Sequence, residues 1–481
     1  MTAPARLKSF IGGSWHDSQS DEWIADVNPS DAKDVIAHVP HGTDDDVRAA
    51  VGAASKALPA WRALPGPARA ELLYKWGAAI ADRQEQLAQL VTREVGKPIG
   101  EARGEAGRCV AILRYYAGEA VRAVGDVIPA QSAGALQFTI SPPLGVVALI
   151  TPWNFPIAIP LWKAAPAIAF GNTVVLKPAE MSSQSALFLA ECAAAAGIPA
   201  GVFNVIVGNG AVIGPSLLAA SEVRAVSFTG SGRVGAMVAS AAAARNIRYQ
   251  TEMGGKNVAI VMPDADIKLA ASLTAAGAMR YAGQKCTATS RVVVAREVEA
   301  TFLDELRSQV AALPIGPVTD ASSAVGPVIS SASRDSIRGI LSEMDAESIY
   351  VGDVSSAAYG DGFFLPPTIV RNAAADSALA QRELFGPVLA SFSATDLDHA
   401  IDLANSTPYG LSASLFTRDL RSALKYIDRI EAGMVRVNGD TTGVDPHAPF
   451  GGMKSSSSGS REQGPAARDF YTETKTVQIN P

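Results

Sequence analysis

Cys286 is the residue whose setting most suggests chemistry. It is one of three cysteines among 481 residues, and it lies in the segment GQKCTATS (283–290), where a glycine and small polar side chains leave the sulfur little cover. A cysteine that only packs usually lies in an apolar stripe. A nucleophilic cysteine reacts as the thiolate and needs a group that favours that form. No histidine is near Cys286 in the sequence, so the segment is compatible with a nucleophile and with a buried structural thiol.

Glu252 is a second candidate, and its position allows two roles. It ends a predicted strand and is followed by two glycines in EMGGKN. Glycines at such a point let a substrate or a second chain segment come close, so the carboxyl could serve as a general base. Glu252 also lies 22 residues after Gly230, about where a dinucleotide-binding fold places the carboxylate that binds a ribose.

Two further groups suit a ligand with phosphate and sugar. Gly230, Gly232 and Gly235 form a G-x-G-x-x-G pattern between a predicted strand and a predicted helix. Free backbone N–H groups at a helix start attract phosphate, although the same glycines could serve only a tight turn. Lys177 and Glu180, in LKPAE, follow another predicted strand, where they suit a sugar–phosphate ligand or form a solvated loop pair.

An alternation of strand and helix patterns provides the framework for these residues. Helical spacing dominates to about residue 122, and Cys109 and Cys192 lie in helical patterns where we expect them to pack. The segment 454–460, KSSSSGS, is predicted to be an ordered loop. Such alternation implies an α/β fold with a parallel sheet covered by helices on both faces. Strands are predicted at 146–150, 173–177, 203–207, 223–228 and 247–252.

Composition excludes several classes of protein. The chain is 48% hydrophobic and 18% charged, which is typical of a globular protein. Its net charge of −6 is spread without a basic stripe, so we expect no nucleic-acid partner. Three cysteines without a signal-like N-terminus favour a reducing compartment, and we expect the cytoplasm. The uncharged stretch 138–162 contains five prolines, so it is not read as a membrane span. No Cys/His cluster has metal-ligand spacing, so no metal is predicted.

Seven motifs occur in one order along the chain: TPWNFP (151–156), KPAE (177–180), FTGS (228–231), EMGGKN (252–257), GQKC (283–286), ELFGPV (383–388) and PFGGMKSS (449–456). Together they resemble the NAD(P)-dependent aldehyde dehydrogenase superfamily over essentially the whole chain. Four longer stretches are WNFPIAIPLWKAAPAIAFGNTVVLKPAE (153–180), GQKCTATSR (283–291), HAPFGGMKSSSSGSREQG (447–464) and DFYTETKT (469–476). Within the superfamily, these stretches resemble the 2,5-dioxopentanoate (α-ketoglutaric semialdehyde) dehydrogenases.

The resemblance implies three catalytic roles. Cys286 matches the nucleophile, Glu252 the general base, and Asn154 the amide that stabilises the oxyanion together with the Cys286 backbone N–H. An aldehyde would form a thiohemiacetal on the cysteine, lose hydride to the nicotinamide, and leave as the acid after hydrolysis of a thioester.

The resemblance also implies a cofactor site for NAD or NADP. We expect NAD to be preferred, because a carboxylate at Glu180 would repel a 2′-phosphate, although Lys177 acts in the opposite direction. The family usually has a non-glycine residue in place of Gly232, so the glycine pattern is not given ordinary fingerprint weight. The residues implied in cofactor binding are Trp153, Lys177, Glu180, Gly230, Ser231, Glu383 and Phe385.

For the substrate, the resemblance points to a small aldehyde that carries a carboxylate. Arg280 lies six residues before Cys286 and matches an arginine of succinic semialdehyde dehydrogenases, whereas Trp162 stands where those enzymes have a second arginine. We expect 2,5-dioxopentanoate or a related semialdehyde. A dehydrogenase for a broad range of aliphatic or aromatic aldehydes, such as benzaldehyde-like compounds, is the alternative, and a non-catalytic binding protein is a third.

The resemblance finally implies three parts and a symmetric assembly. A Rossmann-like cofactor domain is expected over 1–122 and 144–252, and an α/β catalytic domain over 253–450. An oligomerisation arm is expected to combine 123–143 with 451–481. Such arms cover strand edges with a partner subunit, so we expect a homodimer or homotetramer.

Overall fold

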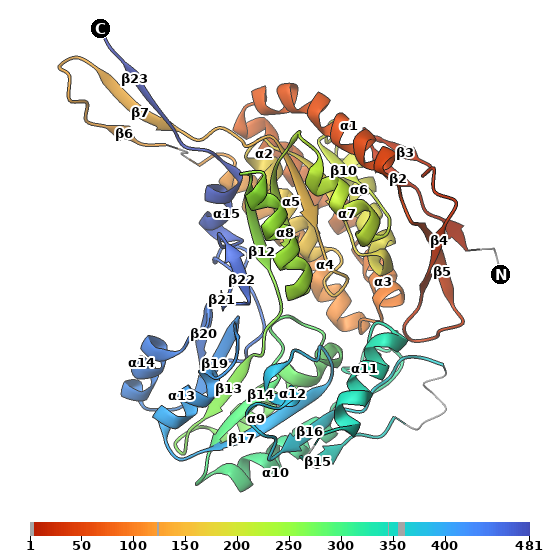
Figure 1. Cartoon of the computed structure of the whole chain (residues 1–481), viewed down its shortest axis with the longest axis vertical. Helices are drawn as coiled ribbons and strands as arrows, with labels where there is room; N and C mark the ends of the chain where they lie inside the picture. Colours follow the sequence, from red (N-terminus) through yellow and green to blue (C-terminus); the bar gives the residue numbers. More distant parts are fainter. Residues whose placement is uncertain (1–3, 123–124, 345, 355–360) are drawn as a thin grey trace.

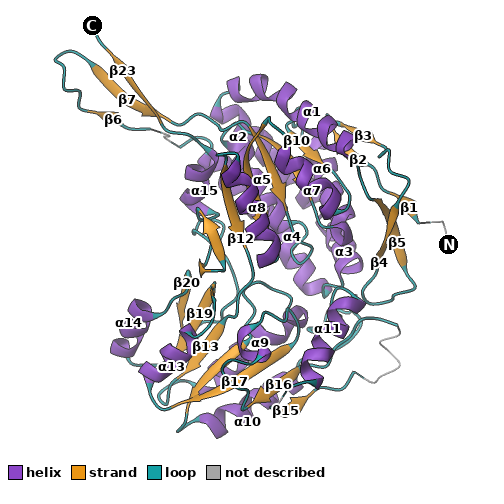
Figure 2. Ribbon diagram, in the orientation of Figure 1, coloured by secondary structure: helices purple, strands orange, loops and turns teal. Residues whose placement is uncertain are grey.

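The computed structural model describes residues 4–122, 125–344, 346–354 and 361–481. Residues 123–124, which belong to the expected arm, therefore lie outside the described part. Figures 1 and 2 show two bodies, each built on a sheet with helices against it, and a narrow strand ribbon that projects from one of them. None of the described helices is both long and apolar enough to cross a membrane.

The first body is built on an eight-stranded sheet of order β22-β12-β11-β8-β9-β10-β2-β3, in which β12, β11, β8, β9 and β10 are parallel. The parallel strands follow the predicted ones closely, although the third is shorter than expected. The strands are β2 (Ser9–Ile11), β3 (Ser14–His16), β8 (Val146–Ile150), β9 (Thr173–Lys177), β10 (Phe203–Val205), β11 (Val223–Thr229), β12 (Arg248–Glu252) and β22 (Ser457–Gly459).

Helices cover both faces of this sheet, which explains why its central strands are apolar throughout. Leu149 and Leu176 belong to one core cluster, and Ala148 and Val175, their chain neighbours, to another on the opposite face. The α/β prediction is confirmed. The first cluster includes residues of α2 (Gly66–Asp82), α3 (Gln84–Val95), α4 (Ile99–Glu119), α5 (Ala158–Ala169) and α6 (Ser183–Ala195), and the second residues of α1 (Asp44–Ala63), α7 (Gly210–Ala219) and α8 (Gly232–Ala244).

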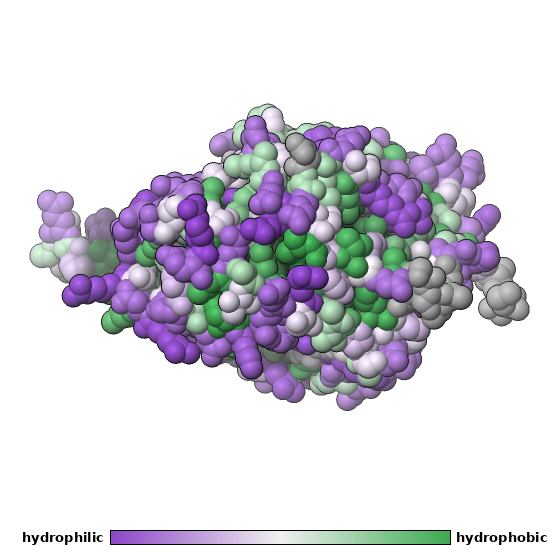
Figure 3. All heavy atoms as spheres, turned by 90° about the horizontal axis from the view of Figure 1, so that it is seen from below, coloured by the Kyte–Doolittle hydropathy of each residue, from purple (hydrophilic) through white to green (hydrophobic). Residues whose placement is uncertain are grey.

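The second body contains a seven-stranded sheet of order β15-β16-β17-β14-β13-β19-β20. Its core is a separate cluster of buried residues. Figure 3 views the molecule from below and shows hydrophilic side chains around smaller apolar areas. The elements are β13 (Val258–Val261), α9 (Ile267–Met279), β14 (Arg291–Ala295), α10 (Glu299–Ala311), α11 (Ser331–Ser342), β15 (Glu347–Val351), β16 (Thr368–Arg371), α12 (Ala378–Gln381), β17 (Val388–Ala394), α13 (Leu397–Asn405), β19 (Ser412–Phe416), α14 (Leu420–Arg429) and β20 (Met434–Val437).

The projecting ribbon is an antiparallel sheet of order β23-β7-β6 (Figure 1). Part of the segment 454–460 is strand rather than the expected loop, because β22 pairs with β12. The domain boundaries stay a prediction. The remaining elements are β6 (Val127–Ile128), β7 (Leu136–Ile140), β23 (Lys475–Ile479), β1 (Ala5–Arg6), β4 (Trp23–Val27), β5 (Val35–Pro40), β18 (Tyr409–Gly410), β21 (Met453–Lys454), α15 (Gly464–Tyr471) and the 3-10 turns η1 (Glu180–Ser182) and η2 (Arg280–Gly283).

Candidate active site

A tight turn positions Cys286 between α9 and β14. Tyr281, Ala282 and Gly283 all have positive φ, at 55°, 50° and 66°. A side chain at Gly283 would place its Cβ 2.4 Å from the carbonyl oxygen of Gly386, so only glycine fits there. Such a sequence of left-handed residues is costly and is typical of functional sites.

Side-chain amides fix this turn from two directions. Asn257 Nδ2 donates to the carbonyl oxygen of Cys286 at 2.8 Å and to that of Ala288 at 2.9 Å. Gln284 Oε1 accepts from the backbone N–H of Ile329 at 2.8 Å. Asn154, on the loop after β8, donates from Nδ2 to the carbonyl oxygen of Gln284 at 3.1 Å, although the two residues are 130 positions apart. Asn154 therefore lies against the Cys286 turn, and this bond uses one of its two amide hydrogens.

Glu105, on α4, fixes the loop that carries Asn154. Its Oε1 accepts from the backbone N–H groups of Ile157 at 3.1 Å and Ala158 at 3.0 Å, at the start of α5. The same carboxylate forms a buried ion pair with Lys97. A carboxylate at a helix N-terminus satisfies N–H groups that have no partner within the helix.

Glu252 ends β12 and is 1% exposed. Ser457 Oγ donates to its Oε2 at 2.5 Å, and its Oε1 is buried without a hydrogen-bond partner among the described residues. Burial and the nearby charge of Glu462 raise the pKa of Glu252 well above its usual value. A carboxyl group with a raised pKa and an unengaged oxygen is suited to accept a proton near neutral pH.

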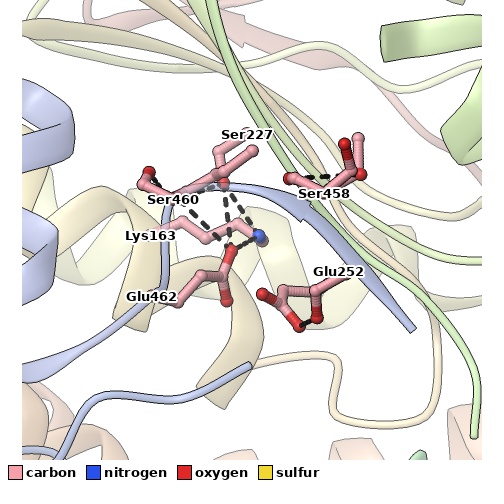
Figure 4. A network of polar contacts seen from close by, with 9 residues as sticks. Lys163, Ser227, Glu252, Ser458, Ser460 and Glu462 are labelled. Atoms are coloured by element: carbon pink, nitrogen blue, oxygen red, sulfur yellow. Dashed lines mark hydrogen bonds and ion pairs between the residues drawn. The ribbon is translucent and has the colours of Figure 1, made fainter. Parts of the chain in front are cut away.

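A buried polar network lies beside Glu252 and was missed by the sequence analysis. Lys163, on α5, pairs with Glu462 and donates to Ser227 Oγ at 2.8 Å. Gln250 Nε2 also donates to Ser227 Oγ at 2.8 Å. Figure 4 shows Lys163 and Glu462 meeting near Ser227, with Glu252 next to them. In the sequence, this network is indicated only by a lysine within the apolar helix α5, because its partner Glu462 lies 299 residues away.

The environment of Cys286 does not favour its thiolate. Burial, together with the charges of Glu383 and Glu252, raises the pKa of the Cys286 thiol to about 12. A nucleophilic cysteine needs a group that favours the thiolate, and the charged neighbours here have the opposite effect. The thiol therefore needs a base to take its proton as it reacts, and Glu252 is close enough for its charge to act on Cys286.

Lys177 and Glu180 lie at the carboxyl end of β9. Lys177 Nζ donates to Glu180 Oε1 at 3.2 Å, and the backbone N–H of Gly210 donates to the same oxygen at 2.5 Å. Burial disfavours the charged carboxylate, but the Lys177 charge and backbone N–H groups outweigh it and hold the pKa of Glu180 below its usual value. The pair is thus an ordered feature of the sheet edge rather than a solvated loop pair.

The turn between β11 and α8 carries Gly230 and Ser231. A Cβ at Gly232 would meet nothing within 4 Å, whereas one at Gly235 would lie 2.5 Å from Met253 Sδ. Gly235 is therefore needed for packing, while Gly232 opens onto free space. Nearby strand ends contribute buried hydroxyl groups without a partner among the described residues, at Thr151 and Thr229. Unpaired polar groups at the carboxyl edge of a parallel sheet fit a dinucleotide.

Glu383 faces the glycines that follow Glu252. Its Oε1 accepts from the backbone N–H of Gly255 at 3.1 Å, and a Cβ at Gly254 would lie 1.9 Å from its Oε2. Burial raises the pKa of Glu383 to about 7. Phe385 follows on the same loop, and its ring meets that of Trp153 edge to face at 5.5 Å. These motifs, far apart in the sequence, therefore meet near Cys286.

Cys286 opens on its other side into a cavity of about 540 Å³. Arg280 and Trp162, which the sequence resemblance implies in substrate binding, both line this cavity. Phe450 also lines it, and its ring lies 5.7 Å from that of Trp162. The structure thus brings the predicted substrate residues to one cavity with the nucleophile. The described residues contain no group of three or more His, Cys, Asp or Glu side chains that could hold a metal ion.

Comparison with known proteins identifies the family. The sequence model that describes the aldehyde dehydrogenase family matches residues 15–477 of this chain. The chain belongs to the aldehyde dehydrogenase family. Aldehyde dehydrogenases are NAD(P)-dependent oxidoreductases, and this aldehyde dehydrogenase shares their nicotinamide cofactor.

Individual relatives of this aldehyde dehydrogenase match nearly its full length. It is 44% identical to an alpha-ketoglutaric semialdehyde dehydrogenase of Bacillus subtilis over 98% of each chain. It is 40% identical to an alpha-ketoglutarate semialdehyde dehydrogenase of Haloferax volcanii over 99% of each chain. The crystal structure of an NAD-dependent aldehyde dehydrogenase from Sinorhizobium meliloti matches with a TM-score of 0.95 at 37% identity, covering 99% of this chain and 95% of that one.

Proposed function

We propose that this aldehyde dehydrogenase oxidises 2,5-dioxopentanoate, or a closely related semialdehyde, to the corresponding acid. The relatives from Bacillus subtilis and Haloferax volcanii are named for α-ketoglutaric semialdehyde, another name for this compound. The observation that carries the proposal is the cavity, in which the Arg280 cation and the Cys286 thiol line the same space. A substrate with an aldehyde at one end and a carboxylate at the other suits both groups.

In the first step, Cys286 Sγ attacks the aldehyde carbon while its proton is removed. Glu252 accepts that proton, because its Oε1 has no partner among the described residues and its pKa is raised. The negative charge that develops on the substrate oxygen is stabilised by Asn154 and by the backbone N–H of Cys286. Asn154 is buried and held against the Cys286 turn, so little reorganisation is needed as the charge forms.

The chain residues around the cleft would hold a nicotinamide dinucleotide, which when bound supplies a hydride acceptor. Lys177 and Glu180 would bind the adenosine ribose, and Glu383 the nicotinamide ribose. Gly230 and Ser231 lie at a helix start, which suits the pyrophosphate. Trp153 and Phe385 would enclose the nicotinamide end of the cleft.

We further propose that NAD is preferred over NADP. The Glu180 carboxylate stays ionised at neutral pH, because its pKa is lowered. It can accept hydrogen bonds from a ribose 2′-hydroxyl and would repel a 2′-phosphate. Lys177 Nζ, 3.2 Å from Glu180 Oε1, offsets part of that repulsion, so the preference for NAD is modest.

Before the second half of the reaction, Glu252 releases to solvent the proton that it took from Cys286. The ionised Glu252 then takes a proton from water as the water oxygen adds to the thioester carbon on Cys286. The C–S bond breaks, the acid leaves, and the sulfur regains a proton from Glu252, which restores the thiol. The adjacent Lys163–Glu462 pair is buried and linked to Ser227 and Gln250. Burial raises the pKa of Glu252 most, the Glu462 charge raises it further, and the Lys163 charge lowers it, so this network adjusts the basicity of the group that activates water.

The protein is proposed to form a homodimer or homotetramer. The ribbon of β6, β7 and β23 exposes apolar side chains at Val127, Leu136, Ile140 and Ile479. Exposed strand edges with apolar residues favour cover by a second subunit. Light scattering on the purified protein tests this proposal, and a monomer at micromolar concentration would contradict it.

A dehydrogenase for aliphatic or aromatic aldehydes in general is the second candidate. The observation in its favour is the apolar part of the cavity, where Trp162, Phe155 and Phe450 form a wall. The deciding experiment measures kcat/KM for a panel of aldehydes with NAD and with NADP. The main proposal expects 2,5-dioxopentanoate with NAD to rank first. A higher kcat/KM for benzaldehyde than for the oxo acid would favour the second candidate, and no turnover of any aldehyde would favour a binding protein.

A further inference from the structure

The cavity contains a second arginine that the sequence analysis did not identify. Arg108, on α4, lines the same space as Arg280 and Cys286. Its Nη1 donates to the carbonyl oxygen of Val444 at 3.0 Å, and Val444 also lines the cavity. This bond uses one of the five guanidinium N–H groups, so the planar fork keeps donors for a ligand. Arg108 is half-buried, and its position is therefore defined by the protein.

Helical spacing brings Arg108 to this place. Glu101, Glu105 and Arg108 are separated by four and three residues, so they lie on one face of α4. All three line the cavity. Gly104 lies on the same side, and a Cβ there would meet nothing within 4 Å, which shows that the helix surface faces open space at this point.

The carboxylates of this cavity wall already have partners. Glu101 pairs with Lys285 Nζ at 2.9 Å, and Glu105 pairs with Lys97. By contrast, neither Arg108 nor Arg280 has a carboxylate of the described residues within ion-pair distance of 4.0 Å. Burial disfavours the Glu101 carboxylate, but the charges of Lys285, Lys97 and Arg280 hold its pKa below the usual value, so Glu101 lies near enough to act on Arg280. The cavity thus contains two arginine cations that form no ion pair with the described residues.

We propose that Arg108 determines specificity by binding the substrate carboxylate together with Arg280. The inference rests on the proposed function in that the substrate carries a carboxylate. Guanidinium groups match the geometry of a carboxylate and bind it with two parallel hydrogen bonds. Arg108, held by Val444, supplies the fixed part of this site, whereas Arg280 is exposed. The substrate then lies with its aldehyde at Cys286 and its carboxylate between the two arginines.

The test compares two aldehydes of equal chain length, 2,5-dioxopentanoate and uncharged pentanal, on the full-length enzyme with NAD. Arg108→Met should lower kcat/KM for the oxo acid by about 10- to 150-fold, mainly through KM, because a charge-assisted hydrogen bond is lost. The value for pentanal should stay within about twofold. Arg108→Lys keeps the charge but not the planar guanidinium, so its kcat/KM for the oxo acid should fall between those of the wild type and Arg108→Met. Arg114→Met is the matched control, since Arg114 lies on the same helix, is exposed, and does not line the cavity.

An inhibition measurement gives a second readout that does not depend on turnover of the oxo acid. Glutarate, a dicarboxylate of the same length without an aldehyde, should inhibit pentanal oxidation by the wild type. Its inhibition constant should rise by about 10-fold or more in Arg108→Met. An unchanged inhibition constant, or an equal loss on both aldehydes, would overturn the assignment of Arg108. A wild type that does not prefer the oxo acid over pentanal would instead overturn the proposed substrate, so the two failures are distinguishable.

Discussion

Replacing Asn154 by alanine is the sharpest test of the oxyanion site. The side chain is 3% exposed, and Nδ2 donates to the carbonyl oxygen of Gln284, which precedes the nucleophile by two residues. The substitution removes the one side-chain donor that the proposal places beside the reacting carbonyl, and it leaves Cys286 and Glu252 unchanged. Asn154→Asp keeps the shape of the side chain but replaces the amide by a carboxylate, which would face the developing negative charge.

The expected loss of kcat in the Asn154 variants follows from the role of the Asn154 amide as an oxyanion donor. Removing one preorganised donor to an oxyanion costs about 10²–10³ in kcat, or roughly 2.7–4 kcal/mol of transition-state stabilisation. Loss of the structural bond to Gln284 alone would contribute only about 0.5–1.5 kcal/mol. We therefore expect Asn154→Ala to lose about 10²–10³ in kcat, and Asn154→Asp to lose at least as much. Cofactor reduction at saturating aldehyde and NAD gives kcat directly.

Two controls separate catalysis from folding in this experiment. The melting temperature and the affinity for NAD should be close to wild type in Asn154→Ala, since neither cofactor contacts nor the sheet are altered. Asn154→Asp should melt at a lower temperature, because it leaves a buried carboxylate against the carbonyl oxygen of Gln284. An effect confined to KM would refute the oxyanion role, because an interaction made only in the transition state changes kcat. A kcat loss below about tenfold would also refute it, since the structural bond alone accounts for that much.

The remaining predictions concern the carboxylates. Glu252→Gln should give one rapid burst of reduced cofactor followed by slow turnover, because an amide cannot take the proton from water. Stopped-flow absorbance measures this burst, and an unchanged steady-state turnover would return Glu252 to a ribose-binding role. Glu462→Gln should shift the ascending limb of the pH–kcat profile to lower pH, since loss of a neighbouring negative charge lowers the raised pKa of Glu252; no shift would contradict this coupling. Glu180→Gln should raise kcat/KM for NADP relative to NAD by about tenfold, because repulsion between the Glu180 carboxylate and a 2′-phosphate about 4 Å away costs ~1–4 kcal/mol. An unchanged ratio of the two kcat/KM values would remove Glu180 as the discriminating residue.

The sequence was informative where function follows from local pattern. Lys177, Gly230 and Glu252 each lie at or just after the carboxyl end of a predicted strand, and parallel pairing brings such ends to one edge. Their meeting could therefore be predicted without coordinates. The third strand was predicted two residues too long, because the buried apolar run continues through Ile206 and Val207 after the pairing with β9 ends at Val205. Burial alone does not mark the end of a strand.

The residues that the sequence did not reveal depend on contacts between distant segments. Lys163 meets Glu462 across 299 positions, and Arg108 meets Val444 across 336. No local spacing encodes such contacts, because they arise only when α4, α5 and the C-terminal segments pack together. The raised pKa of Cys286 has the same origin, since it follows from burial and from carboxylates on other segments.

The central claim is that aldehyde oxidation proceeds through a covalent bond to Cys286. Its most direct test measures NAD reduction by Cys286→Ala with 2,5-dioxopentanoate, beside Cys109→Ala and Cys192→Ala as controls, since both of those cysteines are buried in helices. The account predicts no measurable turnover for Cys286→Ala with NAD affinity retained, and near wild-type turnover for the two controls. Turnover of a tenth or more of wild type in Cys286→Ala would contradict the covalent mechanism.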